Sequence, residues 1–241
     1  MPRQSQVFVL CRAIAVALVL LPAPAAPAQE QMRFDVLFRG LAVARITLTA
    51  RDDGAVYAVA GRVETTGIAA AFRRVRFGMQ AEGRWRGARP RPRRYAEDVD
   101  TGRRRSTVEM RFDGGRPRIV RQAPSPGPAA VAPRDADGHA DPLSALWRLV
   151  RGGPRDGLCG FALPVYDGAR QSELAVAAAG AAPPVRCRGR YTRLAGFPAD
   201  AMAERRHFPF SAVYAEREGR YVLTEVEAMS LLGPIRIVRR D

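Results

Sequence analysis

Alternation of apolar and polar residues runs through most of the chain after residue 30, and it restricts the fold more than any other feature. In the first such stretch Phe34, Val36 and Phe38 share one side, and similar stretches follow to the end of the chain. Turn signals of the Asp-Gly type separate them, as at 52–54 and 113–115. Period-two runs joined by short turns are typical of antiparallel strands. The sequence therefore predicts a mainly β protein, a curved antiparallel sheet or half-barrel with a dry face and an Arg-rich wet face.

One helix is expected near 142–151. Asp141 can cap it and Pro142 suits its first turn, and its apolar residues recur at helical spacing on one face. A shorter helical crossing is expected at 68–74, and a Pro/Ala-rich loop occupies 123–140. That loop could divide two domains, but a lone helix must bury its apolar stripe on something. We therefore expect a single β-rich domain over 29–241.

Residues 1–28 have the composition of a secretory signal. Arg3 and Arg12 precede or border a short apolar core at 13–21, and the segment ends in Ala26-Pro27-Ala28. The apolar core is too short to span a bilayer, and the small residues suit a signal peptidase. The sequence predicts an exported, periplasmic protein that is soluble after cleavage and begins near Gln29. No later apolar run reaches the length of a membrane span.

The positive charge of the chain is carried by arginine alone. Its formal net charge is +15, and all 39 basic residues are Arg. Removal of 1–28 takes away two of them and leaves +13. Such a charge favours anionic partners, which include lipid head groups, lipopolysaccharide and anionic glycans. Export argues against nucleic acid as the intended partner, and contact with a membrane is expected to be peripheral at most.

Two cysteines remain after removal of the leader, Cys159 and Cys187. An even number in an exported chain predicts one disulfide, and closing a loop of this size contributes about 3–4 kcal/mol in the chain-entropy model. Two unpaired buried thiols are the alternative. Cys11 lies in the leader segment and leaves with it.

Catalytic and metal-binding patterns are sparse. His139 and Asp141 have a spacing that suits two metal ligands, but the second histidine, His207, is far away in sequence. The acidic run with Glu97, Asp98 and Asp100 could supply a glycosidase pair, although flanking arginines make charge balance the simpler interpretation. We expect no catalytic residue, no metal and no cofactor.

Two groups of residues are candidates for binding. Arginines concentrated between residues 84 and 105 could dock phosphate or carboxylate groups, or could form a solvated loop that keeps a sheet edge soluble. This group consists of Arg84, Arg86, Arg89, Arg91, Arg93, Arg94, Arg103, Arg104 and Arg105. Large apolar side chains could line a groove for an acyl chain between helix and sheet, or could simply pack as core. This second group consists of Phe34, Phe38, Trp85, Leu143, Leu146 and Trp147.

Several motifs together resemble a known family. They are Asp141 to Leu146 (DPLSAL), Pro164 to Arg170 (PVYDGAR), and Cys187 with Tyr191. The chain resembles exported proteobacterial proteins of domain of unknown function 3108, and Ala169 stands where that family more often has Arg. The resemblance implies an antiparallel half-barrel, akin to lipoprotein-carrier folds. It implies no established activity and no catalytic residue.

Three functions are compatible with these features. The first is a non-enzymatic periplasmic protein that binds or carries an apolar or amphipathic envelope ligand. The second is a structural or interaction module that docks an anionic envelope polymer through its Arg-rich face. The third is a hydrolase with an unrecognised site, which would need an acid/base pair brought together by the fold. The oligomeric state is left open.

Overall fold

The computed structural model describes residues 29–72, 74–180 and 183–240. The predicted leader, 1–28, lies outside the described residues. Among the helices of the described part, none is long and apolar enough to cross a membrane.

Strands make up most of the described chain. In order they are β1 (Glu30–Phe38), β2 (Leu41–Asp52), β3 (Val56–Thr65), β4 (Arg76–Arg86), β5 (Arg89–Asp100), β6 (Arg105–Asp113), β7 (Arg116–Ala123), β8 (Phe161–Tyr166), β9 (Gln171–Ala178), β10 (Val185–Ala195), β11 (His207–Arg217), β12 (Arg220–Ser230) and β13 (Gly233–Arg239). The helices are α1 (Gly67–Phe72), α2 (Pro142–Val150) and α3 (Ala199–Glu204), with single 3-10 turns at Pro133–Asp135 and Arg155–Gly157.

All thirteen described strands belong to one antiparallel sheet. Strands β1 to β7 follow one another as a meander, and so do β8 to β13. The two meanders join through β1 and β13, where Phe34 lies opposite Arg239. Strands β7 and β8 are the edges, so the sheet does not close into a barrel. The predicted fold class, a curved antiparallel sheet with a packed helix, is confirmed.

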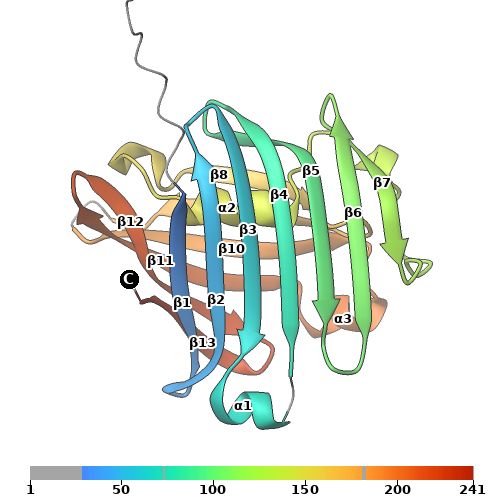
Figure 1. The fold of residues 1–241 in the computed structure, drawn as a ribbon, viewed down its shortest axis with the longest axis horizontal. Helices are drawn as coiled ribbons and strands as arrows, with labels where there is room; N and C mark the ends of the chain where they lie inside the picture. Colours follow the sequence, from blue (N-terminus) through green and yellow to red (C-terminus); the bar gives the residue numbers. More distant parts are fainter. Residues whose placement is uncertain (1–28, 73, 181–182, 241) are drawn as a thin grey trace, which may run out of the picture.

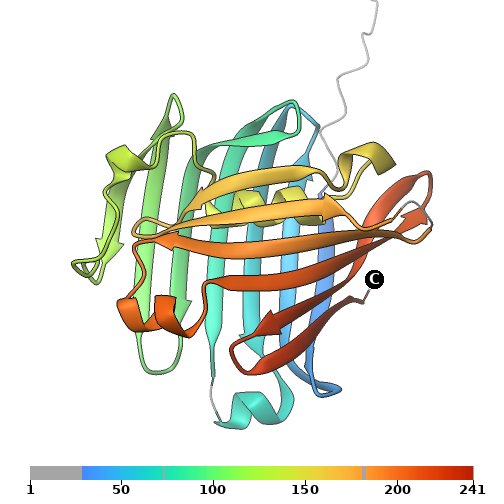
Figure 2. The same ribbon diagram turned by 180° about the vertical axis from the view of Figure 1, so that it is seen from behind.

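The sheet folds over so that its two halves face each other, with α2 between them. In Figure 1 the strands of the first half stand in front of α2, and in Figure 2 the strands β8 to β12 cross in front of it. Side chains alternate as the period-two pattern predicts: on β3, Tyr57 and Val59 are buried while Ala58 and Ala60 are exposed. The interior is filled by large side chains with almost no solvent exposure, among them Tyr95, Met110, Trp147 and Tyr214.

Helix α2 begins at the predicted cap. The Asp141 carboxylate accepts a hydrogen bond from Ser144 N at 2.8 Å and another from Ser144 Oγ at 2.5 Å. The Tyr57 hydroxyl of β3 shares a 2.7 Å hydrogen bond with the same Ser144 hydroxyl. All three side chains are buried. This chain of hydrogen bonds attaches the start of α2 to the first half of the sheet.

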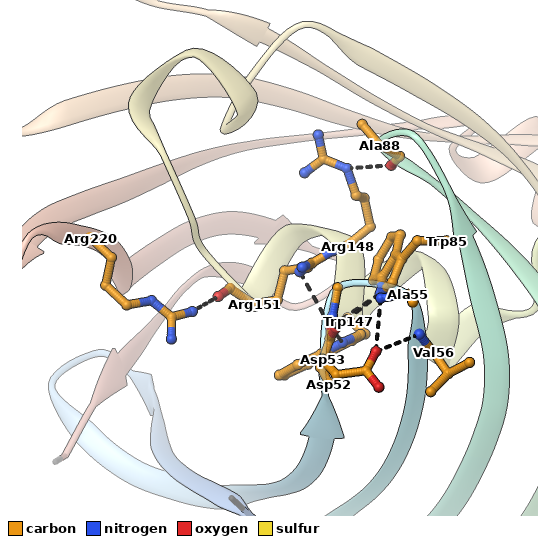
Figure 3. Close-up of polar contacts among 11 residues, drawn as sticks. Asp52, Asp53, Ala55, Val56, Trp85, Ala88, Trp147, Arg148, Arg151 and Arg220 are labelled. Atoms are coloured by element: carbon orange, nitrogen blue, oxygen red, sulfur yellow. Dashed lines mark hydrogen bonds and ion pairs between the residues drawn. The ribbon is translucent and has the colours of Figure 1, made fainter. Parts of the chain in front are cut away.

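A second polar cluster holds the end of α2 (Figure 3). The Asp52 carboxylate, at the end of β2, accepts hydrogen bonds from Trp147 Nε1 at 2.8 Å and from Trp85 Nε1 at 3.1 Å. Arg151 follows α2 and forms an ion pair with Asp52 at 3.3 Å, while its guanidinium lies 4.1 Å from the Trp85 ring centre. The two tryptophans of the chain therefore share one nearly buried carboxylate, and this shared acceptor fixes α2 against β2 and β4.

Loss of that carboxylate is expected to be costly. Asp52→Ala leaves two indole N–H groups and one guanidinium without their acceptor in a largely dry site, and we expect the free energy of unfolding to fall by about 3 kcal/mol. Urea denaturation followed by far-ultraviolet circular dichroism measures it. Asp113→Ala removes an exposed carboxylate at another hairpin, and its effect should stay within about 0.5 kcal/mol. Equal stability of the two variants would contradict this role of Asp52.

Burial also makes the contribution of Asp141 to stability depend on pH. It raises the pKa of this carboxyl to about 6 from a usual value of 3.8, although hydrogen bonds from Ser144 oppose the shift. Between these two values the folded state binds a proton that the unfolded state has released. The contribution of Asp141 to stability is therefore present at pH 4 and lost as the pH rises through 6.

The Asp141→Asn variant tests this, because Asn keeps the capping geometry but does not titrate. The free energy of unfolding of the natural chain minus that of the variant should decrease between pH 4 and 7 by about 2 kcal/mol. Asp156→Asn, at an exposed position, is the matched control. A difference that stays constant with pH would show that Asp141 titrates normally.

Candidate binding site

The junction between the edge strands β7 and β8, which we call the seam, is one place where the molecule is hollowed next to titratable side chains. The segment 124–140 leaves β7 and runs along the free edge of β8. Val131 N donates to Ala169 O at 2.8 Å, and Ala140 N donates to Pro164 O at 2.8 Å. From the other side Gln122 Nε2 donates to Gly168 O at 3.3 Å. The seam is thus bridged by loop and side-chain contacts instead of a strand pair.

The β8–β9 turn is docked into this seam. The Asp167 carboxylate accepts hydrogen bonds from Ala169 N at 2.9 Å and Arg170 N at 2.7 Å, which holds the turn. Gly168 has φ +101°, and a Cβ at this position would lie 2.8 Å from Val108 Cγ1. A glycine is therefore required both by the backbone conformation and by the close approach to β6.

A cleft of about 510 Å³ lies at this junction, and we call it the seam cleft. It is lined by β5 to β7, by the Pro-rich loop, by the β8–β9 turn and by the loop before α3. The lining residues are Glu97, Arg104, Ser106, Val108, Gln122, Ala123, Pro124, Pro126, Gly127, Pro128, Ala129, Ala130, Asp167, Ala169, Arg170, Gly196, Pro198 and Ala199.

The seam cleft has an apolar side of proline and alanine and a polar side with both signs of charge. Glu97 and Asp167 are partly buried, whereas Arg104 and Arg170 are exposed. Burial raises the pKa of Glu97, and the nearby Asp167 raises it further, against a hydrogen bond from Tyr95 and the charge of Arg170. Burial likewise raises the pKa of Asp167, although the two turn N–H groups oppose it. Tyr95 donates its hydroxyl to Glu97 Oε2 at 2.6 Å.

The acidic run is divided between the two faces of β5. Neighbours on a strand point to opposite faces, so Glu97 faces the seam cleft while Asp98 lies on the outer face. Asp100 accepts hydrogen bonds from Gly102 N and Arg105 Nε, the charge balance that the flanking arginines indicated. Glu97 instead shares the seam cleft with Asp167, which comes from the other half of the sheet. Sequence spacing carried no signal for this juxtaposition.

The predicted groove residues lie elsewhere. Phe34, Leu143 and Trp147 are buried, and Trp85 and Leu146 pack against the same cluster. Core packing, the alternative weighed from the sequence, is what the structure shows for these five. Phe38 is separate from them: its ring lies at the end of β1, beside Gly233 and under the Arg39 guanidinium.

The comparisons with known proteins agree with this architecture. The model of a family described as a protein of unknown function (DUF3108) matches residues 33–193. The chain belongs to the DUF3108 family. Its match extends from β1 to β10 and includes the polar side of the seam cleft. No curated protein matches the chain.

Among solved structures, this DUF3108 protein is similar to a β-barrel-like protein of domain of unknown function DUF1849 from Brucella abortus. The TM-score is 0.56 at 10% sequence identity, over 90% of this chain and 98% of that one. At such low identity the likeness concerns the fold alone.

The predicted arginine cluster is divided by the DUF3108 fold. Six of its members surround the β4–β5 turn, whereas Arg103, Arg104 and Arg105 lie at the β5–β6 turn. The two turns are at opposite ends of β5 (Figure 1). The first group gains neighbours that are distant in sequence, because Arg94 lies opposite Arg111 on β6, and Arg111 lies opposite Arg118 on β7. The structure thus creates an arginine row that the sequence did not indicate.

The remaining predicted site residues have structural roles. Asp141 caps α2, and His139 Nδ1 lies 3.2 Å from Asp137 O. His207, at the start of β11, lies 3.3 Å from the hydroxyl of Thr192 on the neighbouring strand β10. Among the described residues no three His, Cys, Asp or Glu side chains are grouped as metal ligands. Cys159 and Cys187 form the predicted disulfide, which ties the segment before β8 to β10.

Proposed function

We propose that the protein is an exported, non-enzymatic binding protein that holds an amphipathic envelope ligand in the seam cleft. The observation that carries the proposal is the composition of this cleft: an apolar wall faces two partly buried carboxyl groups and two arginines in a volume of about 510 Å³. Ligand sites are commonly concave, of several hundred Å³, mainly apolar and equipped with a few converging polar groups.

The two sides of the cleft suit different parts of one ligand. The Pro124 to Ala130 segment offers prolines and alanines that contact aliphatic chain, and it requires no hydrogen bond from the ligand. Glu97 and Asp167 accept hydrogen bonds from hydroxyl or ammonium groups, while Arg104 and Arg170 bind phosphate or carboxylate. A ligand with an aliphatic body and a polar head of mixed charge matches this arrangement.

Binding fits the carboxyl groups better than acid/base catalysis. The Asp167 carboxylate is engaged by two N–H groups of its own turn, and Glu97 is engaged by the Tyr95 hydroxyl. Both contacts stabilise the charged form and oppose the effect of burial on the pKa. Groups fixed in this way hold the shape of the seam, and their remaining lone pairs are available to a bound head group.

Export is supported by two features of the chain. The composition of residues 1–28 is that of a cleaved secretory signal. The Cys159–Cys187 disulfide lies within the described fold, and disulfides persist mainly in oxidising compartments outside the cytosol.

Native mass spectrometry of protein purified gently from the periplasm tests the proposal. We expect a chain that begins near Gln29, contains one disulfide and carries a ligand that denaturation releases. Ala129→Trp places an indole in the cleft and should abolish the bound mass, whereas Ala179→Trp, at an exposed position outside the cleft, should retain it. A natural chain without ligand, or equal occupancy in Ala129→Trp, would overturn the assignment.

The arginine row favours a second candidate function, docking of an anionic envelope polymer. Arg94, Arg111 and Arg118 are exposed cross-strand neighbours, and of the three Arg94 is paired with Glu109 at 3.1 Å. Like charges opposite each other on neighbouring strands repel, so a bound anion would stabilise the row. The affinity for lipopolysaccharide should therefore fall steeply as the salt concentration rises. It should also fall about tenfold when all three arginines are replaced by Gln. The same change at Arg186, Arg188 and Arg190 of β10 is the charge-matched control. If both triple variants weaken binding equally, net charge alone explains the interaction and the arginine row has no specific role.

A further inference from the structure

Large apolar side chains are exposed at one end of the molecule, at three neighbouring chain reversals. Leu41 lies at the β1–β2 turn, Phe72 at the end of α1, and Leu231 and Leu232 form the β12–β13 turn. Phe72 is 87% exposed and Leu232 is 84% exposed. We call these four residues the apolar rim. Contiguous exposed apolar surface marks sites of interaction with a partner or a membrane.

The three segments that carry the rim are neighbours at one end of the sheet. Strand β13 pairs with β1, and β1 pairs with β2. A Cβ at Gly233 would lie 3.7 Å from the Phe38 ring, which places the β12–β13 turn beside the β1–β2 turn. On the other flank, Thr66 N donates to Val43 O at 3.0 Å just before α1. Figures 1 and 2 both show α1 and these turns at the same end of the molecule.

The segments that form the rim carry charge of one sign. The segments 38–44, 66–75 and 229–234 contain no Asp and no Glu, although the protein has 24 acidic residues. Arg39 lies at the β1–β2 turn with its guanidinium 5.4 Å from the centre of the Phe38 ring, and Arg74 is exposed just after α1. Apolar turn tips that carry arginine and no carboxylate of their own favour contact with an anionic surface.

We propose that the apolar rim docks on the surface of an anionic lipid bilayer. The leucine and phenylalanine side chains enter the interfacial layer, and Arg39 and Arg74 contact lipid phosphates. Side chains on separate turn tips suit a deformable lipid phase, and the strong net positive charge draws the protein toward anionic head groups. This mode of attachment is independent of whether the seam cleft holds a ligand.

Cosedimentation of the mature protein with vesicles tests the rim. We use phosphatidylcholine vesicles with and without about 30% phosphatidylglycerol, at low and high salt. Leu231→Ser combined with Leu232→Ser should lower the partition coefficient about tenfold or more, because two exposed leucines no longer enter the lipid. The combination Val56→Ser and Val120→Ser removes exposed apolar side chains away from the rim, and it should leave binding unchanged. Arg39→Gln with Arg74→Gln should weaken binding to the anionic vesicles only.

A second readout reports insertion directly. Leu232→Trp should show a blue-shifted emission on addition of anionic vesicles, whereas Val120→Trp should not. Binding of the Leu231→Ser/Leu232→Ser variant at the level of the natural chain would overturn the proposal, as would an unshifted Leu232→Trp emission at lipid concentrations that sediment the protein. Vesicle binding lost only in the Arg94, Arg111 and Arg118 variant would also overturn it. So would a dimer that the two serine substitutions dissociate without any vesicle binding, since the rim would then contact a second copy.

Discussion

The carboxylate of Asp52 is the acceptor on which the arrangement of helix and sheet depends. It receives both tryptophan N–H groups and the Arg151 guanidinium, and so connects β2, β4 and the end of α2. The Asp141–Ser144–Tyr57 hydrogen bonds hold the opposite end of the same helix. Polar groups fixed at both ends define where α2 lies, while its buried side chains fill the space between the two halves of the sheet. Apolar packing alone is non-directional and would specify the helix position less strictly.

An open sheet of this length must manage two free edges. The structure covers the β8 edge with the segment 124–140 and docks the β8–β9 turn against β6 and β7. Covered edges protect a β protein from pairing with other chains. The contacts between unlike elements fit less closely than a strand pair would, and the seam cleft is the space that results. The candidate site therefore results from the joining of the two sheet edges by loop contacts and not by a strand pair.

The elements of the fold were predictable from the sequence because their signals are local. Period-two runs gave the strands, Asp141 and Pro142 marked the start of α2, and the cysteine pair indicated the disulfide. The site was not predictable, because it depends on which distant strands become neighbours. Glu97 and Asp167 meet only across the seam, and the length of β5 separates arginines that are close in sequence. The predicted groove residues were ambiguous for a similar reason, because apolar side chains that pack as core and those that contact a ligand have the same pattern in the sequence.

The pairing of β1 with β13 has a consequence for how the chain reaches its final state. The two meanders are each local, but the strands that join them are the first and the last of the described chain. The joint forms only when β13 meets β1, so it brings together the strands of the described chain that are farthest apart in sequence. Contacts of this kind make folding slow and late. Each meander can therefore gain its local strand pairs first, and the pairing of β1 with β13 then completes the sheet.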